Sequence, residues 1–482
     1  MHYPHESRAP SRAHRTALVA LAAAALVAAC SDRNPLAPPT ASLTPPSIAA
    51  SRGSTGQGAA SRYVVIANQP EGVTGTLTMQ TALTLNTVST HIRQLGGSIE
   101  RAHANIAVMT VNGLSAAAAE ELATRPGVEA VVPDLVVQWI PPLSRMSVHT
   151  ASADQSGAAF FTRQWNMRVI RANNAWLITP AGAHTLACIL DTGIDPGHLD
   201  LAGKVDLAKS TSFVVTEPDI FDRAAHGSFV AALVSSNGIG IASVAPNAKL
   251  CALKVLDQTG SGSFADLIAA IAFAADLNAD VANMSLGALV SKKDPGVKQL
   301  IKALQRAVNY AFRRGTLSVA AAGNDALNTN TEGDLISIPA QLDHVISVGA
   351  TAPTNQMNFD NIASYSEYGR KGVTVFAPGG DLVAGGVVED LILSVCSRYT
   401  VGINCTNGRT YLFAAGTSFS APHVTGEALV VKSVYPNADA ARITHCILVG
   451  ADHPTGRVDD PIYSRGRINV VGGARCSRAG QD

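Results

Sequence analysis

The sequence predicts an α/β protein in which helices cover both faces of a doubly wound, mostly parallel sheet, preceded by a smaller α+β domain. Continuous apolar runs at residues 185–190 and 249–256 indicate strands that are buried on both faces. Amphipathic or alanine-rich segments at residues 264–277 and 296–314 indicate helices that alternate with such strands. Strands and helices that alternate in this way form parallel sheets, whose ligands bind at the carboxyl ends of the strands.

The bulk composition is that of a globular protein with a large core. The chain has 482 residues, of which 47% are hydrophobic and only 15% are charged. A chain of this length is expected to contain more than one domain. Lys+Arg and Asp+Glu are equal at 36 each, so the charge does not indicate nucleic acid or acidic lipid as the main partner.

The N-terminus predicts export. Three arginines precede an apolar run at residues 16–29, and Cys30 follows it, so we interpret residues 1–30 as a secretory signal peptide. The sequence Val-Ala-Ala-Cys at its end resembles a bacterial lipobox, in which Cys30 would be acylated and would anchor a cell-envelope precursor. The alternative is an ordinary signal peptide that is cut near an alanine, with Cys30 incidental.

Residues 31–61 are rich in Pro, Ser, Thr, Gly and Ala and predict a flexible linker. Residues 62–138 then read as strand, helix, strand, helix and strand, which predicts a small α+β domain of ferredoxin-like type. Residues 139–161 are again irregular and contain Pro141 and Pro142. The main α/β domain occupies residues 162–482.

Three separated motifs carry an acid, a base and a hydroxyl. Asp191 follows a buried strand, His226 opens a helix in His-Gly-Ser, and Ser418 opens another helix in Gly-Thr-Ser. Pro422 is tolerated in the first turn of that last helix. An acid, a base and a hydroxyl are the groups that nucleophilic acyl transfer requires. Taken alone, each motif is an ordinary turn or helix cap.

A fourth motif supplies an amide. Asn324 follows a glycine at the end of a buried strand, where its side chain would meet the oxygen of a tetrahedral intermediate. The N-terminus of the Ser418 helix adds a backbone N–H donor to the same oxygen. Gly-Asn on its own is only a turn signal.

The order Asp, His, Ser is that of the subtilisin layout. From about residue 164 to residue 470, the chain resembles the subtilisin-like serine protease family, which has the corresponding fold. The resemblance implies that Asp191 orients His226, and that His226 takes the proton of Ser418. It implies that Asn324 binds the oxyanion. Ser418 does not lie in a Gly-x-Ser-x-Gly motif, which argues against an α/β-hydrolase.

The resemblance also implies a substrate cleft. Its members are the edges Gly260, Ser261, Gly262 and Ser285, Leu286, Gly287, with Ala322 and Gly323 in the pocket wall. A peptide held as an added strand is recognised mainly through its backbone, which predicts broad specificity. Small residues, including Ala288 and Ala321, predict an open, apolar pocket. The family has Thr where Ser228 stands and Met where Phe419 stands.

The domain at residues 62–138 resembles the inhibitory propeptide that precedes many subtilisin-like proteases. The resemblance implies an intramolecular inhibitor and folding aid that is cut off within residues 139–161. The alternative is an unrelated binding domain.

Six cysteines remain besides Cys30, and an even number in an exported chain favours disulfides. We favour the two local pairings, Cys396 with Cys405 and Cys446 with Cys476. Cys188 and Cys251 lie in apolar runs, where they either pair with each other or remain buried thiols.

The predicted chemistry requires no cofactor. Asp200 resembles an aspartate that binds structural calcium in some relatives, and Asn237 falls near a second ligand position. The loop after His226 is shorter than that family pattern, and solvated surface side chains are the alternative.

The leading hypothesis is an exported serine endopeptidase that acts on proteins or peptides. One alternative is a catalytically silent binding protein of the same fold, against which the intact set of four site residues argues. The other is an esterase or acyltransferase that uses the same site.

Overall fold

The computed structural model describes residues 61–69, 77–141, 147–149, 158–405 and 407–476. The predicted signal peptide, Cys30 and nearly all of the predicted linker lie outside these residues. Among the helices of the described part, none has the length and apolar character needed to cross a membrane.

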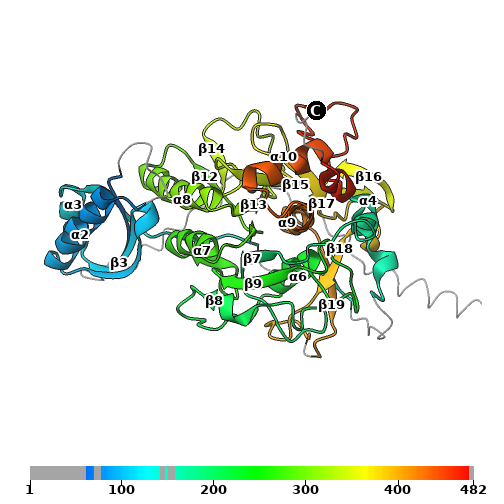
Figure 1. Cartoon of the computed structure of the whole chain (residues 1–482), viewed down its shortest axis with the longest axis horizontal. Coiled ribbons are helices and arrows are strands. Elements are labelled where there is room, and N and C mark those ends of the chain that lie inside the picture. The colour runs from blue at the N-terminus through cyan, green and yellow to red at the C-terminus, as the bar shows by residue number, and fades with distance from the viewer. Residues whose placement is uncertain (1–60, 70–76, 142–146, 150–157, 406, 477–482) are drawn as a thin grey trace, which may run out of the picture. The chain divides into compact units, whose positions relative to one another are not determined.

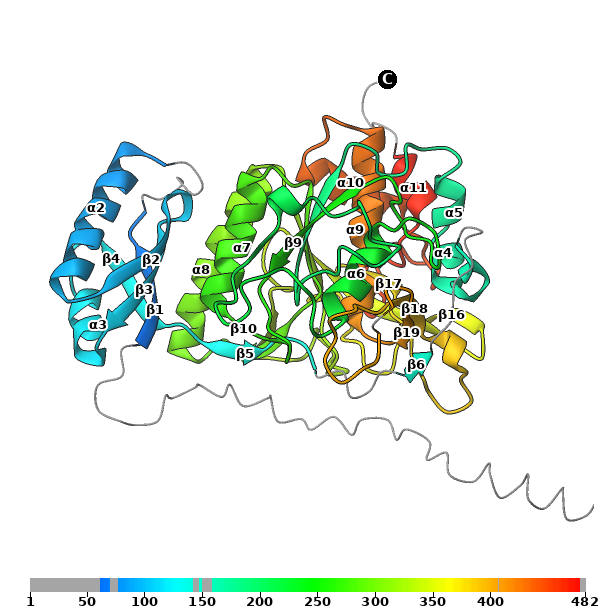
Figure 2. The same cartoon turned by 90° about the horizontal axis from the view of Figure 1, so that it is seen from below.

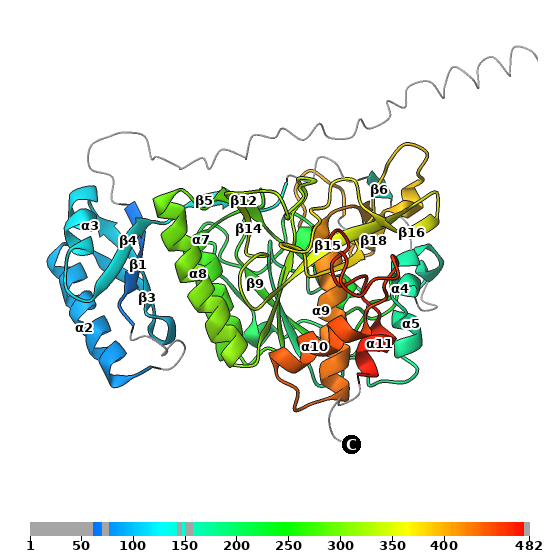
Figure 3. The ribbon, with the colours of Figure 1, turned by 90° about the horizontal axis from the view of Figure 1, so that it is seen from above.

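The smaller domain is a four-stranded antiparallel sheet with two helices on one face (Figures 2 and 3). Its strands lie in the order β2-β3-β1-β4, so the predicted ferredoxin-like fold is confirmed. Its elements are β1 (Ser61–Ala67), α2 (Met79–Gln94), β2 (Ser98–His103), η1 (Ala104–Ile106), β3 (Val108–Leu114), α3 (Ala116–Ala123) and β4 (Val128–Pro133).

Sequence reasoning missed β2. This strand pairs only with β3 and lies at the edge of the sheet, and its Ser-Ile-Glu-Arg-Ala-His sequence is partly exposed along its length. An edge strand without an apolar face gives no alternating pattern. Strand β3 starts at Val108, because residues 104–106 form a 3₁₀ turn that ends with Ala107 in the left-handed region.

Residues of β1 alternate between two cores. Tyr63 and Val65 pack in the core of the smaller domain, under α2 and α3. Val64 and Ile66 point to the opposite face and join the core that contains helices α7 and α8 of the main domain. The smaller domain therefore packs on the main domain through the face of its sheet that carries no helices.

The main domain is built on an eight-stranded sheet with the path β16-β15-β13-β11-β7-β9-β8, with β17 paired to β15. Its pairings are parallel except for that of β16 with β15. The strands of this sheet are β7 (Leu186–Asp191), β8 (Thr211–Ser212), β9 (Lys249–Lys254), β11 (Val281–Met284), β13 (Leu317–Ala321), β15 (Val345–Thr354), β16 (Met357–Ile362) and β17 (Val375–Pro378).

Helices lie on both faces of this sheet (Figure 1). The helical elements are η2 (Phe161–Arg163), α4 (Trp165–Val169), α5 (Ala172–Ala175), η3 (Leu207–Lys209), α6 (His226–Val234), α7 (Phe264–Asp276), α8 (Pro295–Arg313), η4 (Val388–Asp390), α9 (Thr417–Val434), α10 (Ala440–Gly450) and α11 (Val470–Ala474). Alternate residues of β7 therefore pack on opposite faces of the sheet. Cys188 and Leu190 join the core that contains α7 and α8. Ala187 and Ile189 join the core that contains α6 and α9. Both faces are buried, so the predicted doubly wound fold is confirmed.

Smaller sheets flank the main one. Strand β5 pairs antiparallel with β10, β12 with β14, and β19 lies between β18 and β6. Their bounds are β5 (Val136–Gln138), β6 (Ser147–His149), β10 (Ser261–Ser263), β12 (Ala288–Ser291), β14 (Leu335–Ile338), β18 (Ile392–Val395) and β19 (Tyr411–Ala414). Strand β5 lies at the end of the predicted smaller domain, and β6 lies in the predicted linker that follows it.

Three disulfides are present. Cys396 pairs with Cys405 and Cys446 with Cys476, as the sequence predicted. Cys188 and Cys251, which the sequence left open, also pair. They lie directly opposite each other on the neighbouring strands β7 and β9, a register that sequence reasoning did not assign.

We expect the Cys188–Cys251 disulfide to be the most stabilising of the three, because it closes the longest loop, with a separation of 63 residues. Replacing both cysteines by alanine should lower the free energy of unfolding by about 2–4 kcal/mol in urea denaturation. The matched control replaces Cys396 and Cys405, which are only 9 residues apart, and should lose less. Free thiols at Cys188 and Cys251 in native protein would contradict this assignment.

Candidate active site

The carboxyl end of β7 places Asp191 against His226. The Asp191 Oδ1 atom accepts a hydrogen bond from His226 Nδ1 at 2.8 Å and another from the Thr192 N–H at 2.7 Å. The Asp191 side chain is fully buried, and its Oδ2 atom has no hydrogen-bond partner among the described residues. This geometry fixes the imidazole with Nδ1 toward the acid, so that Nε2 is left for chemistry.

Glycine at position 227 lets α6 start this close to Asp191. A methyl group on its α-carbon would lie 2.1 Å from the Gly193 carbonyl oxygen. The neighbouring Ser228 hydroxyl accepts a hydrogen bond from the Asp195 N–H at 2.9 Å, and the Ser228 N–H donates to Asp222 at 2.8 Å. A threonine hydroxyl would accept the first bond equally well, so serine at this position preserves the contact.

The surroundings of His226 favour its protonated form. Burial by itself lowers the pKa of this imidazole, but the charge of Asp191, its hydrogen bond and the charge of Asp222 outweigh burial and raise the pKa above the ordinary value of 6.5. A base with a raised pKa holds a proton better during the reaction, and it is inactive at acidic pH.

Ser418 is the second residue of α9, whose N-terminus lies beside the start of α6. The ring of Phe419 contacts the ring of His226 with centroids 5.5 Å apart, and the Ser418 carbonyl accepts a hydrogen bond from the Ser285 hydroxyl at 2.6 Å. The described contacts include no hydrogen bond between His226 and the Ser418 hydroxyl. Such bonds are often long before substrate binds.

Asn324 is held by the residue that precedes the serine. Its Oδ1 atom accepts from the Thr417 N–H at 2.9 Å and from the Thr417 hydroxyl at 2.8 Å. The oxygen end of the amide is thus fixed on α9, and the NH₂ end is the one available to a ligand. The Asn324 residue is exposed, as a donor to a substrate must be.

A buried chain of hydrogen bonds that sequence reasoning missed ties α9 to β11. The Thr425 hydroxyl donates to Asn283 at 2.8 Å, and the Asn283 amide donates to the Ser285 hydroxyl at 2.9 Å. Ser285 then donates to the Ser418 carbonyl. Thr425 and Asn283 are fully buried, and the sequence gives no signal of the contact between them.

Strand β5, which leads from the smaller domain to the main domain, lies at the predicted substrate edges (Figure 2). Strand β5 pairs with β10 so that Val137 faces Gly262 and Gln138 faces Ser261. Beyond β5, the Trp139 N–H donates to the Gly260 carbonyl at 3.0 Å. The Trp139 carbonyl accepts from the Gly287 N–H at 3.1 Å. The chain therefore lies between both edges as an added strand.

The other predicted cleft residues surround this strand. Ser285 and Leu286 are buried directly before Gly287, and Ala322 is buried at the end of β13. Gly323 follows it, with φ of +130°, a conformation that favours glycine, and its N–H donates to the Thr417 hydroxyl at 3.3 Å. The residues predicted from sequence are thus brought to one region.

Asp200 and Asn237, the candidate calcium ligands, both make hydrogen bonds within the chain, and the Asn237 amide donates to the Leu199 and Ala202 carbonyls at 2.8 Å and 2.9 Å. The Asp200 carboxylate accepts from the Ile239, Gly240 and Ile241 N–H groups and from the Tyr411 hydroxyl at 2.7–3.2 Å. Three of these donors bind Oδ2 and one binds Oδ1. Among the described residues, no three His, Cys, Asp or Glu side chains gather to hold a metal ion.

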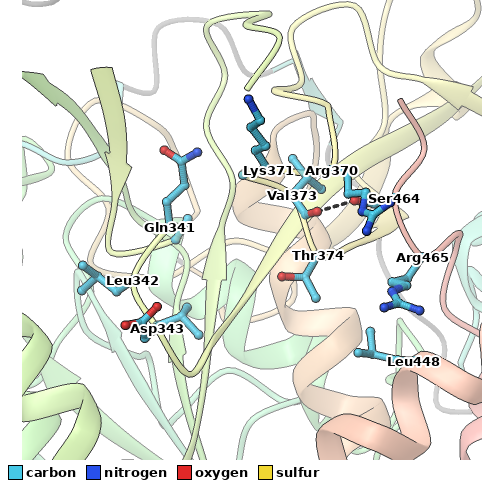
Figure 4. Close-up of a pocket in the computed structure, with 13 residues that line it drawn as sticks. Gln341, Leu342, Asp343, Arg370, Lys371, Val373, Thr374, Leu448, Ser464 and Arg465 are labelled. Atoms are coloured by element: carbon cyan, nitrogen blue, oxygen red, sulfur yellow. Dashed lines mark hydrogen bonds between the residues drawn. The ribbon is translucent and has the colours of Figure 1, made fainter. Parts of the chain in front are cut away.

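A hollow of about 390 Å³ lies elsewhere on the main domain (Figure 4). It is lined by residues 340–343, Val345, residues 370–374, Leu448, Ser464 and Arg465, and it includes none of the predicted site residues. Its two arginines, Arg370 and Arg465, both pair with the single carboxylate of Asp459, at 2.8 Å and 3.8 Å.

Comparison with known proteins agrees with this geometry. The model of the subtilase family matches residues 182–465, which is more than half of the chain. Thermophilic serine proteinase of Bacillus sp. (strain AK1) is 35% identical over 298 residues, which are 61% of this chain and 63% of that protein. Subtilisin DY of Bacillus licheniformis is 33% identical, covering 65% of this chain and 99% of its own. Thermitase of Thermoactinomyces vulgaris is 34% identical, covering 64% and 95%.

Solved structures share the fold. The epidermin leader peptide processing serine protease of Staphylococcus aureus superposes with a TM-score of 0.69 at 22% identity, covering 88% of this chain and 99% of its own. A lanthipeptide protease superposes with a TM-score of 0.57 at 26% identity, covering 68% and 99%.

Replacing Asp191 by asparagine should lower the rate by about 10⁴-fold, because the imidazole loses its orientation and the charge that stabilises its protonated form. The same loss should lower the pKa of His226, so the acid limb of kcat/KM should move from above pH 6.5 to lower pH. Asp439→Asn, at the distant N-cap of α10, is the control and should change neither quantity. An unmoved acid limb in Asp191→Asn would refute the pairing.

Replacing Asn324 by alanine should lower kcat by about 10²–10³ with little change in KM, because the amide binds the oxyanion and not the ground-state carbonyl. Steady-state kinetics on one peptide measure both. Asn309→Ala on α8, which removes only a contact with Gln305, is the control. Equal kcat values for the two variants would mean that another group binds the oxyanion.

Proposed function

The chain belongs to the subtilase family and is a serine-type endopeptidase, and we propose that Asp191, His226 and Ser418 carry out its peptide-bond hydrolysis in an exported, autoprocessed enzyme. The observation that carries this proposal is the 2.8 Å hydrogen bond between Asp191 and His226, made where the N-terminus of α9 presents Ser418. The substrates are proteins or peptides that enter the cleft as an added strand.

The hydroxyl oxygen of Ser418 attacks the substrate carbonyl carbon while His226 Nε2 accepts the hydroxyl proton. The C–N bond then breaks, and His226 returns this proton to the leaving amine. Water next attacks the acyl-enzyme with His226 again as the base, which releases the acid and restores Ser418. Asn324 and the Ser418 N–H donate to the oxyanion in both halves of the reaction.

The smaller domain acts as the inhibitor of its own enzyme. Asp134, at its end, accepts from the Ala265 N–H in the first turn of α7 at 2.9 Å. Arg62 and Arg101 donate to Asp266 of α7 at 2.8 Å and 2.6 Å. These contacts deliver β5 into the cleft, where it occupies the place of a substrate backbone.

The position of β5 indicates which bond faces the nucleophile. After Trp139 the chain proceeds toward β6, which pairs with the strand that leads to Ser418. Trp139 lies opposite Gly287. Two residues further along the strand, Pro141 is then opposite Ser285, whose hydroxyl binds the Ser418 carbonyl. The next bond in the sequence joins Pro141 to Pro142, and neither nitrogen carries a hydrogen. We infer that this bond is held but not cut.

Contacts of the residues that follow the linker set the C-terminal limit of the cleavage site. The N–H groups of Ala159 and Phe160 donate to the loop at Ile239 and Gly240, at 2.9 Å and 2.8 Å. Gln164 exchanges two hydrogen bonds with Ala242. We assign residues 158–164 to the mature domain on these contacts, so the cut falls within residues 143–157, before or after β6, which pairs with β19. Linkers between domains are the usual sites of proteolytic processing.

The lipid anchor belongs to the prosegment in this proposal. If Cys30 is acylated, the cut leaves the anchored piece in the envelope and releases the protease. Ser418→Ala removes only the nucleophile, so cells that make it should retain full-length, membrane-associated protein. The wild type should yield a soluble form that hydrolyses casein and whose N-terminus falls within residues 143–157.

Two outcomes would contradict this account. Cleavage at the same place in Ser418→Ala would assign processing to another protease, and active wild-type enzyme still continuous with Cys30 would show that release does not occur. A protein that binds casein without cutting it would be the silent binding protein, and one that hydrolyses only esters would be the esterase.

A further inference from the structure

A loop closed by a disulfide lies against the elements that carry the acid and the base of the active site. Cys396 and Cys405 pair across this loop, which lies between β18 and β19, and both cysteines are buried. Strand β18 lies beside α6, the helix that His226 opens, and the Ser394 hydroxyl of β18 donates to a carbonyl of that helix at 2.7 Å (Figure 2). Residues 396–405 are called the disulfide loop below.

Arg398 of the disulfide loop binds Asp195, which follows Asp191 closely in the chain. The guanidinium donates from Nη2 to Oδ1 at 2.8 Å and from Nε to Oδ2 at 3.0 Å, and the Arg398 backbone N–H donates to Oδ2 at 2.9 Å. The Asp195 side chain is fully buried. Burial raises the pKa of this carboxyl group, but hydrogen bonds from Arg398 and from the Gly197 N–H outweigh burial and hold the pKa below its ordinary value of 3.8. Asp195 is therefore a buried anion with Arg398 as its bound cation.

The same loop holds the segment that leads into His226. The Ser397 hydroxyl donates to the Asp222 carbonyl at 2.5 Å. The ring of Tyr399 stacks on that of Phe221, with centroids 4.2 Å apart and ring planes inclined by 11°. The disulfide loop therefore contacts the chain on both sides of the proposed catalytic pair, after the acid and before the base.

These contacts reach the acid and the base through two aspartates. The Asp222 carboxylate accepts from the Thr192 hydroxyl and from the Ser228 N–H, both at 2.8 Å. The Asp195 N–H donates to the Ser228 hydroxyl at 2.9 Å. Thr192 is the chain neighbour of the acid, and Ser228 lies in the first turn of α6 with the base. Because both aspartates contact the disulfide loop, the loop fixes the end of β7 against the start of α6.

We propose that Arg398 is a positioning residue for peptide-bond hydrolysis and that the disulfide loop aligns Asp191 with His226. A displacement of about 1 Å in a reacting group can cost about 10²-fold in rate. The described contacts of Arg398 are with the chain around Asp195 and with the ring of Tyr399, so its loss should change the rate and not substrate binding. This inference rests on the proposed function, in which the aligned pair is the acid and the base.

Arg398→Ala tests this role in the processed enzyme. A fluorophosphonate titration that is run to completion counts the reactive sites, so that turnover can be expressed per site. We expect kcat per site to fall about 10- to 100-fold and KM for a peptide to stay within about threefold, because the base moves while the cleft does not. A merely structural role would lower the number of sites and leave kcat per site at the wild-type value, which would overturn the proposal.

Arg467→Ala is the matched control, since it also removes an arginine from a partly buried ion pair. The Arg467 side chain is 8% exposed and pairs with Asp452 at 2.7 Å, and neither residue belongs to the disulfide loop or to its described partners. A carboxylate that loses its buried partner destabilises the fold. Arg467→Ala should therefore lower stability and leave kcat per site unchanged. An equal fall of kcat per site in both variants would overturn the special role of Arg398.

The disulfides provide a second test that leaves no buried charge unpaired, and it decides the matter if Arg398→Ala yields no active sites. Alanine at Cys396 and Cys405 opens the disulfide loop, whereas alanine at Cys446 and Cys476 opens a loop with a separation of 30 residues. The longer loop should cost more stability when it is opened. Turnover should rank the other way, because only the first pair closes the loop that carries Arg398.

Tyr399→Ala removes the ring that stacks on Phe221 and should also lower kcat per site. Wild-type kcat per site in this variant and in the variant without Cys396 and Cys405 would overturn the inference and leave the proposed function standing. Wild-type enzyme that neither reacts with the fluorophosphonate nor hydrolyses the peptide would overturn the proposed function itself.

Discussion

The active site depends on the attachment of α9 to the end of β11. Thr425, Asn283 and Ser285 form a buried chain of hydrogen bonds that ends on the Ser418 carbonyl. Buried polar groups of this kind are costly when unpaired, so the native arrangement is the one that satisfies all of them. This series of hydrogen bonds fixes the orientation and the position of the N-terminus of α9. The ring of Phe419, the residue after Ser418, contacts the imidazole that Asp191 holds at the end of β7, and the Thr417 N–H before Ser418 donates to the Asn324 side chain.

The same edges that present the substrate also explain the smaller domain. A cleft built from Gly260, Gly262 and Gly287 recognises backbone, and the chain's own segment around Trp139 satisfies it as well as a substrate would. In the proposed function, what distinguishes inhibitor from substrate is the bond presented to the nucleophile. The bond that follows Pro141 has no N–H.

Sequence predicted the features that are local in the chain. The apolar strands, the glycines beside Asp191 and Asn324 and the helix start at Ser418 are written in short motifs, and their order indicated the family. Features that depend on register or on distant contacts were not predictable. The pairing of Cys188 with Cys251 requires the alignment of two strands, and the hydrogen bond of Ser337 to Glu367 joins residues 30 positions apart. The edge strand β2 was missed because its polar residues carry no pattern.

The central claim is that the hydroxyl of Ser418 is the nucleophile, made reactive by its place at the start of α9. A fluorophosphonate probe on the processed, native enzyme, followed by peptide mass spectrometry, tests it most directly, since the probe reacts with an activated serine and leaves a covalent mark. The account predicts one adduct, on Ser418, which forms as casein hydrolysis is lost and does not form after the protein is unfolded. An adduct on another serine, or full hydrolysis by enzyme that carries the Ser418 adduct, would contradict it.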